Sequence, residues 1–120
     1  MSIADLFKRK IVAGKPEKVN DLNFGEEVLS APGPVLVDFW ASWCAPCQVL
    51  GGLLEEVGPE YAGRIRLVKL NVEESPQTAA RFGVSSIPTM IVFKKGKAEE
   101  RKVGLLPLQP LRQWIEQQIR

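Results

Sequence analysis

Two cysteines are the residues of this sequence with the most distinctive chemistry. Cys44 and Cys47 are the only cysteines among the 120 residues, and only Ala45 and Pro46 separate them. A pair at this spacing can act as a redox dithiol, supply half of a zinc site or attach a haem group. The other residue types in the chain decide among these roles.

The sequence contains no histidine, and this excludes two of the possibilities. A c-type haem needs histidine directly after the second cysteine, where this chain has Gln48, and a Cys/His protease needs histidine as its base. A zinc site in one chain would need two carboxylates, or a cysteine pair from a second copy, so we expect no metal. A purely structural disulfide is also disfavoured, because its stabilisation grows with the loop that it closes, and this loop is very short.

Asp38 is the next candidate. It interrupts an otherwise apolar run, residues 35–41, that is typical of a central strand covered on both faces. An ionisable side chain inside such a strand is costly unless it is paired, hydrated or neutral. Asp38 either caps a nearby backbone amide or acts as a buried proton acceptor close to the cysteines, and we favour the acceptor.

The residues after the cysteines predict a helix. Apolar residues recur with helical spacing from Val49 to Val57, and Pro46 suits the first turn, so the helix should begin at the cysteine pair. We expect it to end near Gly58, because Pro59 would clash with the preceding turn. Two glycines, residues 51–52, cost about 1 kcal/mol each relative to alanine, which indicates a bend or a close packing contact.

The remaining pattern predicts an α/β domain. Strands are expected at residues 18–20, 35–40, 65–70, 89–93 and 100–103, and further helices at residues 23–29, 75–82 and 107–119. Asn23 and Glu26 have the spacing of a capping box at the start of the first of these helices. Trp114 lies beside the apolar face of the last helix and is expected to pack in the core rather than bind a ligand.

The first residues are separated from this domain. Residues 3–10 fit a short amphipathic helix with Ser2 as its N-cap, and residues 14–16 fit a linker. Such a helix either lies on the surface of the domain or docks a partner, and we favour the first. We therefore divide the chain into an extension, residues 1–17, and a domain, residues 18–120.

Composition excludes several classes of partner. The net charge of +2 is too small to indicate nucleic acid, and the basic clusters at residues 8–10 and 94–97 are short. No apolar run approaches the length of a membrane span, and the N-terminus lacks the pattern of a secretory signal. We therefore expect a cytoplasmic protein with no nucleic acid and no membrane partner, in a reducing compartment that suits a dithiol.

Taken in order, these motifs resemble the thioredoxin family. A lone Cys-x-x-Cys is a weak signal, but the whole set is specific and extends from about Asn20 to the C-terminus. Four segments carry it: residues 37–47, 69–72, 87–89 and 103–104. The resemblance implies an α/β thioredoxin fold, with a mixed central sheet of five strands, four helices around it, and a cis peptide bond between Ile87 and Pro88. Such a bond is plausible only before proline.

The resemblance also implies a protein-disulfide reductase. Cys44, at a helix N-terminus that lowers its pKa, would be the attacking thiolate, and Cys47 the resolving thiol. Asp38 would take the proton of Cys47 through water, with Lys69 tuning its charge. The reversible disulfide of the two cysteines carries the electrons, so no other cofactor is expected.

The expected partners are a thioredoxin reductase and disulfide-containing client proteins. The protein itself is expected to be a monomer. A target chain would pair with the backbone before the cis proline, a form of strand addition. Trp40 should pack beneath the site. The expected contact surface consists of Trp43, Ala45, Pro46, Ile87, Pro88 and Gly104.

Three positions depart from the family pattern. Ala45 replaces the usual glycine, Gln48 stands where lysine or arginine is common, and Gly52 replaces a helix-kinking proline. The residues between the cysteines affect the reduction potential, which we still expect on the reducing side. Two alternatives remain: a dedicated redox partner or isomerase-like protein, and a non-catalytic interaction module.

Overall fold

The structure is a computed structural model that describes residues 2–6 and 14–120. Helices and strands alternate along most of the chain. Their bounds are β1 (Glu17–Val19), η1 (Gly25–Leu29), β2 (Val35–Trp40), α2 (Ala45–Tyr61), β3 (Arg66–Asn71), α3 (Pro76–Arg81), β4 (Thr89–Lys94), β5 (Lys97–Val103) and α4 (Leu108–Gln118).

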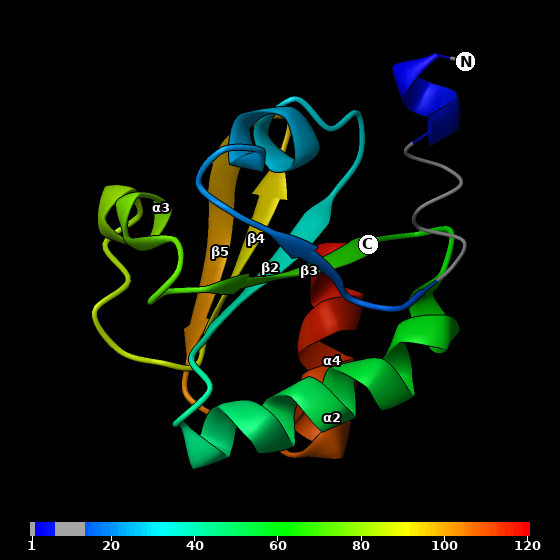
Figure 1. Ribbon diagram of the computed structural model, residues 1–120. Helices are drawn as coiled ribbons and strands as arrows, with labels where there is room; N and C mark the ends of the chain where they lie inside the picture. The colour runs from blue at the N-terminus through cyan, green and yellow to red at the C-terminus, as the bar shows by residue number, and fades with distance from the viewer. Residues whose placement is uncertain (1, 7–13) are drawn as a thin grey trace.

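The five strands form one mixed sheet, in the order β1-β3-β2-β4-β5 (Figure 1). β1, β3 and β2 run parallel to one another, whereas β4 pairs antiparallel with β2 and with β5. β2, the apolar run before the cysteines, therefore has a neighbour on each side. The predicted mixed five-stranded sheet is confirmed.

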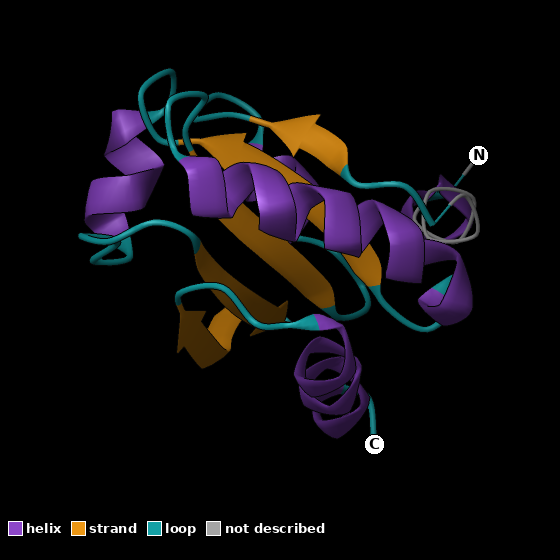
Figure 2. Cartoon of the chain, turned by 90° about the horizontal axis from the view of Figure 1, so that it is seen from below, coloured by secondary structure: helices purple, strands orange, loops and turns teal. Residues whose placement is uncertain are grey.

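Helices cover both faces of the sheet (Figures 1 and 2). Residues of η1 and α3 pack against one face, and residues of α2 and α4 pack against the other. Side chains alternate between the faces along a strand, so Val35, Val37 and Phe39 of β2 join the first cluster while Leu36 joins the second. By the same alternation Asp38 lies on the face that α2 covers.

The prediction that α2 ends near Gly58 is wrong, because the helix continues through Pro59 to Tyr61. Pro59 has no N–H for the intrahelical bond, but the last turn is held by packing. Tyr61 is buried in the core and its hydroxyl donates a hydrogen bond to the carbonyl oxygen of Arg112 at 3.3 Å. Tertiary contacts therefore override the local signal of the proline.

The prediction of Asn23 as the N-cap of the next helix is also wrong. The side-chain oxygen of Asn20 accepts hydrogen bonds from the backbone N–H groups of Leu22 and Asn23, at 2.9 and 3.0 Å. In return, the Asn23 side chain accepts one from the N–H of Asn20 at 2.8 Å. The reciprocal cap thus joins Asn20 to Asn23, three residues earlier than expected, and the regular part, η1, is a π-helix.

β5 begins three residues before the prediction of residues 100–103, at Lys97. Its side chains are mostly exposed and charged, as is common for an edge strand, so it shows no apolar alternation in the sequence. β3 is shifted by one residue relative to the prediction of residues 65–70. Trp114 is only 7% exposed and packs in the core, as predicted.

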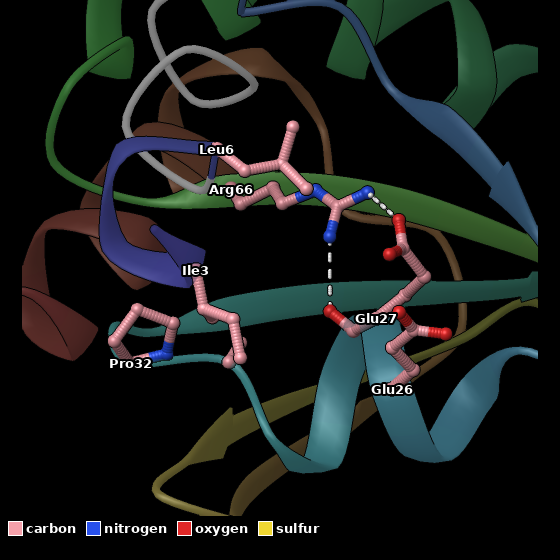
Figure 3. A pocket seen from close by; sticks show the side chains of 7 residues that line it. Ile3, Leu6, Glu26, Glu27, Pro32 and Arg66 are labelled. Atoms are coloured by element: carbon pink, nitrogen blue, oxygen red, sulfur yellow. Dashed lines mark hydrogen bonds and ion pairs between the residues drawn. The ribbon is translucent and has the colours of Figure 1, made fainter. Parts of the chain in front are cut away.

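The N-terminal residues lie against the domain. Residues 3–6 are helical, and the hydroxyl oxygen of Ser2 accepts a hydrogen bond from the N–H of Asp5 at 3.1 Å, so the predicted N-cap is confirmed. The rest of the helix predicted at residues 3–10 lies outside the described residues. Ile3 and Leu6 border a pocket of about 30 Å³ next to Arg66 (Figure 3).

Arg66 fastens β3 to η1 beneath this pocket. Its side chain is buried and donates to the carbonyl oxygen and to the carboxylate of Glu27, both at 2.9 Å (Figure 3). Within the described residues, no helix is both long enough and apolar enough to cross a membrane.

Candidate active site

Cys44 is the N-cap of α2, so the predicted start of the helix at the cysteine pair is confirmed. Its sulfur accepts a hydrogen bond from the N–H of Cys47 at 3.2 Å, and Pro46 lies in the first turn. The two cysteines form a disulfide with their Cα atoms 5.2 Å apart, and both are buried. Free N–H groups and the helix dipole at such an end stabilise a thiolate.

A second segment reaches Cys44 from the loop before β4. The peptide bond between Ile87 and Pro88 is cis, as predicted. The carbonyl oxygen of Ile87 lies 4.0 Å from the Cys44 sulfur. The N–H of Gly104, a residue with φ of +94°, donates to the carbonyl oxygen of Pro88 at 2.8 Å. The loop of Ile87 and Pro88 therefore lies between two segments that are distant in the sequence, with Cys44 next to Ile87 and Gly104 next to Pro88.

The predicted contact residues differ in exposure. Trp43 is 69% exposed, and Ala45 and Pro46 are exposed beside it at the start of α2. Ile87 is half-buried and Pro88 is buried. The structure thus places apolar side chains next to the reactive sulfur, while their part in binding stays a prediction.

Asp38 and Lys69 come from adjacent parallel strands and are direct partners in the register of β2 and β3. Asp38 is only 2% exposed. Burial raises the pKa of Asp38 from its ordinary value of 3.8 to about 7, and the positive charge of Lys69 opposes part of this rise. Asp38 Oδ1 has no hydrogen-bond partner among the described residues, so this oxygen does not cap a described backbone amide.

Trp40 follows Asp38 on the same face of β2. It is half-buried and packs against the cluster that contains both cysteines, in agreement with the prediction that it packs beneath the site. Lys69 Nζ lies 5.7 Å from the centroid of its ring, within the range of a cation–π contact. Lys69 is thereby held beside both Asp38 and Trp40.

A pocket of about 280 Å³ lies next to these residues. It is bordered by two strands and by one flank of α2. Its lining consists of Asp38, Trp40, Cys47, Gln48, Gly51, Gly52, Glu55 and Lys69. Asp38, Lys69 and Cys47 were all predicted from the sequence to take part in the reaction. The three residues border one cavity.

Of the two explanations considered for Gly51 and Gly52, a bend or a close packing contact, the packing contact is absent among the described residues. A Cβ atom at either position would meet no heavy atom within 4 Å, and α2 runs through both without a break. The glycines instead border the pocket.

Sequence reasoning missed Glu55 as a residue of this site, and it treated Gln48 only as a departure from the family pattern. Residues 47, 51 and 55 are spaced by four, which places them on one flank of a helix and is the signal that could have found Glu55. The side chain of Gln48 donates to the carbonyl oxygen of Ser42 at 3.3 Å and so braces the loop before Cys44.

Comparison with known proteins agrees with this geometry. The thioredoxin family model matches residues 15–117. A thioredoxin of Chlorobaculum thiosulfatiphilum is 44% identical over 89% of this chain and 99% of its own length. A thioredoxin of Haemophilus influenzae is 43% identical over 84% of this chain and 94% of its own.

A chloroplastic M-type thioredoxin of Pisum sativum is 44% identical over 84% of this chain, which spans 59% of the pea protein. The redox-active cysteine pair, the mixed sheet and the similarity over most of the length lead to one conclusion. The chain belongs to the thioredoxin family of thiol-disulfide oxidoreductases.

Proposed function

We propose that this protein reduces disulfide bonds of client proteins through Cys44 and Cys47. The Cys44 thiolate attacks one sulfur of the target disulfide, which forms a mixed disulfide and releases one target thiolate. The Cys47 thiolate then attacks the Cys44 sulfur, which forms the Cys44–Cys47 disulfide and releases the second target thiolate. The observation that carries this proposal is the position of Cys44 as the N-cap of α2, next to the Ile87 carbonyl.

Asp38 acts as the base for the second step. It is buried on the α2 face of β2 and borders the same pocket as Cys47. A base works best when its pKa is close to the working pH, and the pKa of Asp38, about 7, meets this condition. Lys69, its register partner, keeps that pKa from rising further.

The apolar surface around Cys44 receives the target. Trp43, Ala45 and Pro46 are exposed next to Cys44 in the chain, and the Ile87 carbonyl approaches the Cys44 sulfur from the loop before β4. Gly104 fastens the chain behind Pro88. An extended target would pair with the backbone before Pro88. The protein would then bind the main chain of the target and accept many different target side chains.

A reductase of the thioredoxin-reductase class would restore the dithiol. We place the protein in the cytoplasm, because a cycling dithiol needs a reducing compartment. We also expect it to be a monomer. Imaging of a tagged copy in the source cells tests the compartment, and sedimentation tests the monomer. Equilibration with a reference protein tests whether Ala45 leaves the potential on the reducing side.

Single-turnover kinetics test the assignment of Asp38. Asp38→Asn should slow the decay of the mixed disulfide by about a hundredfold at pH 7, because a positioned base contributes on this scale, while the first attack changes little. Equal slowing of both steps would remove Asp38 from the base role.

Trapping tests the assignment of the two cysteines. Cys47→Ser should leave client proteins covalently attached to Cys44, as seen on non-reducing gels, whereas Cys44→Ser should trap none. A Cys44→Ser, Cys47→Ser double variant that still performed the cellular role would point to an interaction module instead.

A further inference from the structure

A second pocket, far from the cysteines, is bordered by positive charge. It has a volume of about 370 Å³, and its lining includes four cationic side chains: Arg64, Lys94, Lys95 and Arg120. None of the residues that line it is acidic. We call it the cationic pocket.

Folding brings the cationic pocket together from separate segments. β2 and β4 pair antiparallel, so the chain before β2 lies beside the end of β4. The carbonyl oxygen of Pro34 there accepts a hydrogen bond from the N–H of Arg66 at 3.1 Å, which brings in the loop after α2 that carries Arg64. The chain after α4 supplies Arg120. The sequence shows only the short basic cluster at residues 94–97, to which folding adds two arginines.

Most of the positive charge in this pocket is unpaired. Three of the four cations, all but Arg64, form no ion pair with any described residue. Arg64 pairs with Glu116 at 3.3 Å, and its guanidinium lies 5.2 Å from the centroid of the Tyr61 ring. Like charges that converge without partners repel one another, so an anion between them would be favourable.

Lys95 occupies a backbone position that suits lysine poorly. Lys95 and Gly96 form the two-residue turn between β4 and β5, with φ of 51° and 81°. Positive φ at both residues defines a type I′ turn, whose first position favours asparagine or aspartate. Lysine is strained there, and strain of this kind is concentrated at functional sites. The charge of Lys95 therefore explains its presence better than the turn does.

The pocket also offers a buried hydrogen-bonding group and apolar walls. Gln118 is only 5% exposed, and its amide donates one hydrogen bond, to the carbonyl oxygen of Trp114 at 3.0 Å. The second N–H of this amide has no partner among the described residues. Pro32, Pro34 and Ile119 supply apolar surface beside the cations. The volume lies within the range of small-molecule sites.

We propose that the cationic pocket binds a di- or triphosphate group, either inorganic or carried by a nucleotide. Guanidinium groups such as those of Arg64 and Arg120 match pairs of phosphate oxygens, and the two lysines add point charges. Four cations around one cavity suit a compact group with several negative charges. A polymer or a membrane surface would instead need cations spread along a face.

The pocket is remote from the reacting cysteines. Cys44 caps the start of α2 and Arg64 follows its end (Figure 1), and a helix of 17 residues is about 25 Å long. A target over Cys44 and a phosphate compound in the pocket can therefore be bound together. The proposal does not rest on the proposed function, and the oxidised chain serves for its tests.

Pyrophosphate and ADP are the probes. Calorimetry at low salt should show that each binds one to one, and added salt should weaken the binding because it screens the charges. The largest shifts of backbone amide signals in NMR spectra should occur at residues 94–96 and 118–120. Tighter binding of ADP would identify a nucleotide, held also by the apolar walls, whereas equal affinity would identify the inorganic group.

Lys95→Asn separates binding from folding, because it removes the cation and supplies the residue that the turn prefers. It should weaken pyrophosphate binding at least about fivefold, since it removes a charged hydrogen-bond donor. It should also raise the thermal midpoint by a few degrees. Lys18→Gln is the matched control, because Lys18 is exposed on β1 and does not line the pocket. This variant should bind pyrophosphate as the parent chain does.

Three results would overturn the proposal. The first is no saturable binding of either phosphate compound at millimolar concentration. The second is equal weakening by Lys18→Gln and Lys95→Asn, which would show an effect of net charge alone. The third is a hexaglutamate peptide that binds as tightly as ADP and shifts the same signals, which would make the pocket a docking site for acidic protein segments.

Discussion

Asp38 shows how a single residue couples chemistry to stability. Its carboxyl is buried, and its register partner Lys69 offsets only part of the cost of the charge. A pKa raised on folding means that the native state binds this proton more tightly than the unfolded chain does. Stability from this group is therefore intact below about pH 4 and is lost as pH rises through about 7.

Asp38→Asn should remove this dependence. Between pH 5 and pH 8 the parent chain should lose about 3 kcal/mol of unfolding free energy through Asp38, because its pKa lies at about 7 rather than 3.8. The variant should show a flatter profile and be more stable at pH 8. Urea unfolding of the oxidised protein measures this without titration of the cysteines.

Glu99→Gln, at an exposed position of β5, serves as the control for removal of a carboxylate. It should follow the pH profile of the parent chain. A parent profile that is flat from pH 5 to pH 8, or one that Asp38→Asn leaves unchanged, would contradict the raised pKa of Asp38.

At the scale of elements, α2 combines two tasks. Its apolar flank, with Leu50, Leu54 and Val57, packs in the core, while its flank with Gly51 and Gly52 borders the pocket. The first flank stabilises the helix through burial, and the two glycines of the second lower its intrinsic helix propensity.

Gly51→Ala and Gly52→Ala should therefore each stabilise the protein by about 1 kcal/mol, because alanine is the better helix former and each position is open. Thermal unfolding should show an increase of roughly 4 °C per substitution for a domain of this size. Gly58→Ala is the opposite case, since its Cβ would collide with the backbone of Gly14, and it should destabilise. Destabilisation by the first two would reveal a contact that the structure does not contain.

α3 illustrates a different dependence, since this short helix is capped from elsewhere in the chain. The carboxylate of Asp21 accepts hydrogen bonds from the N–H groups of Thr78 at 2.8 Å and of Gln77 at 3.2 Å. Burial raises the pKa of Asp21, but a hydrogen bond from the Thr78 side chain and the two from these N–H groups together lower it more, so the pKa lies below its ordinary value. No sequence pattern around residues 75–82 predicts this cap, because Asp21 lies in a distant part of the sequence.

For the whole molecule, the active-site end and the N-terminal residues lie far apart (Figure 1). Residues 2–6 meet the domain beside Arg66, whereas Cys44 lies at the opposite end of the long helix α2. No residue from the N-terminal segment that the structure describes borders the pocket at Asp38.

A chain that begins at Gly14 should therefore reduce disulfides at the rate of the full chain. Its unfolding free energy should change by only about 1 kcal/mol, because Ile3 and Leu6 stay 69% and 42% exposed and contribute little burial. Insulin reduction and urea unfolding measure the two effects. Loss of activity with unchanged stability would instead indicate that the extension takes part in binding.

The sequence by itself determined the elements and the reacting groups. The apolar run of β2 and the spacing after Cys47 located the central strand and the start of α2 to within a residue, because buried faces impose a strict period on residue type. The missing histidines and the placement of Asp38 narrowed the chemistry that the cysteine pair can perform. The exposed edge strand β5 was placed least well, since little burial constrains its residues.

Only the tertiary structure decided how α2 passes Pro59, where η1 is capped, and which residues share the pocket beside Asp38. The end of α2 and the pocket depend on atoms from a distant segment: Tyr61 on the carbonyl of Arg112, and the pocket on β2 and β3 facing α2. The cap of η1 is a local exchange of hydrogen bonds between Asn20 and Asn23, which the sequence pattern placed at the wrong residue. A single sequence records which residues are present, but not which of them share a cavity. Gly51 and Gly52 border the same pocket as Asp38, and this proximity is visible only in the folded chain.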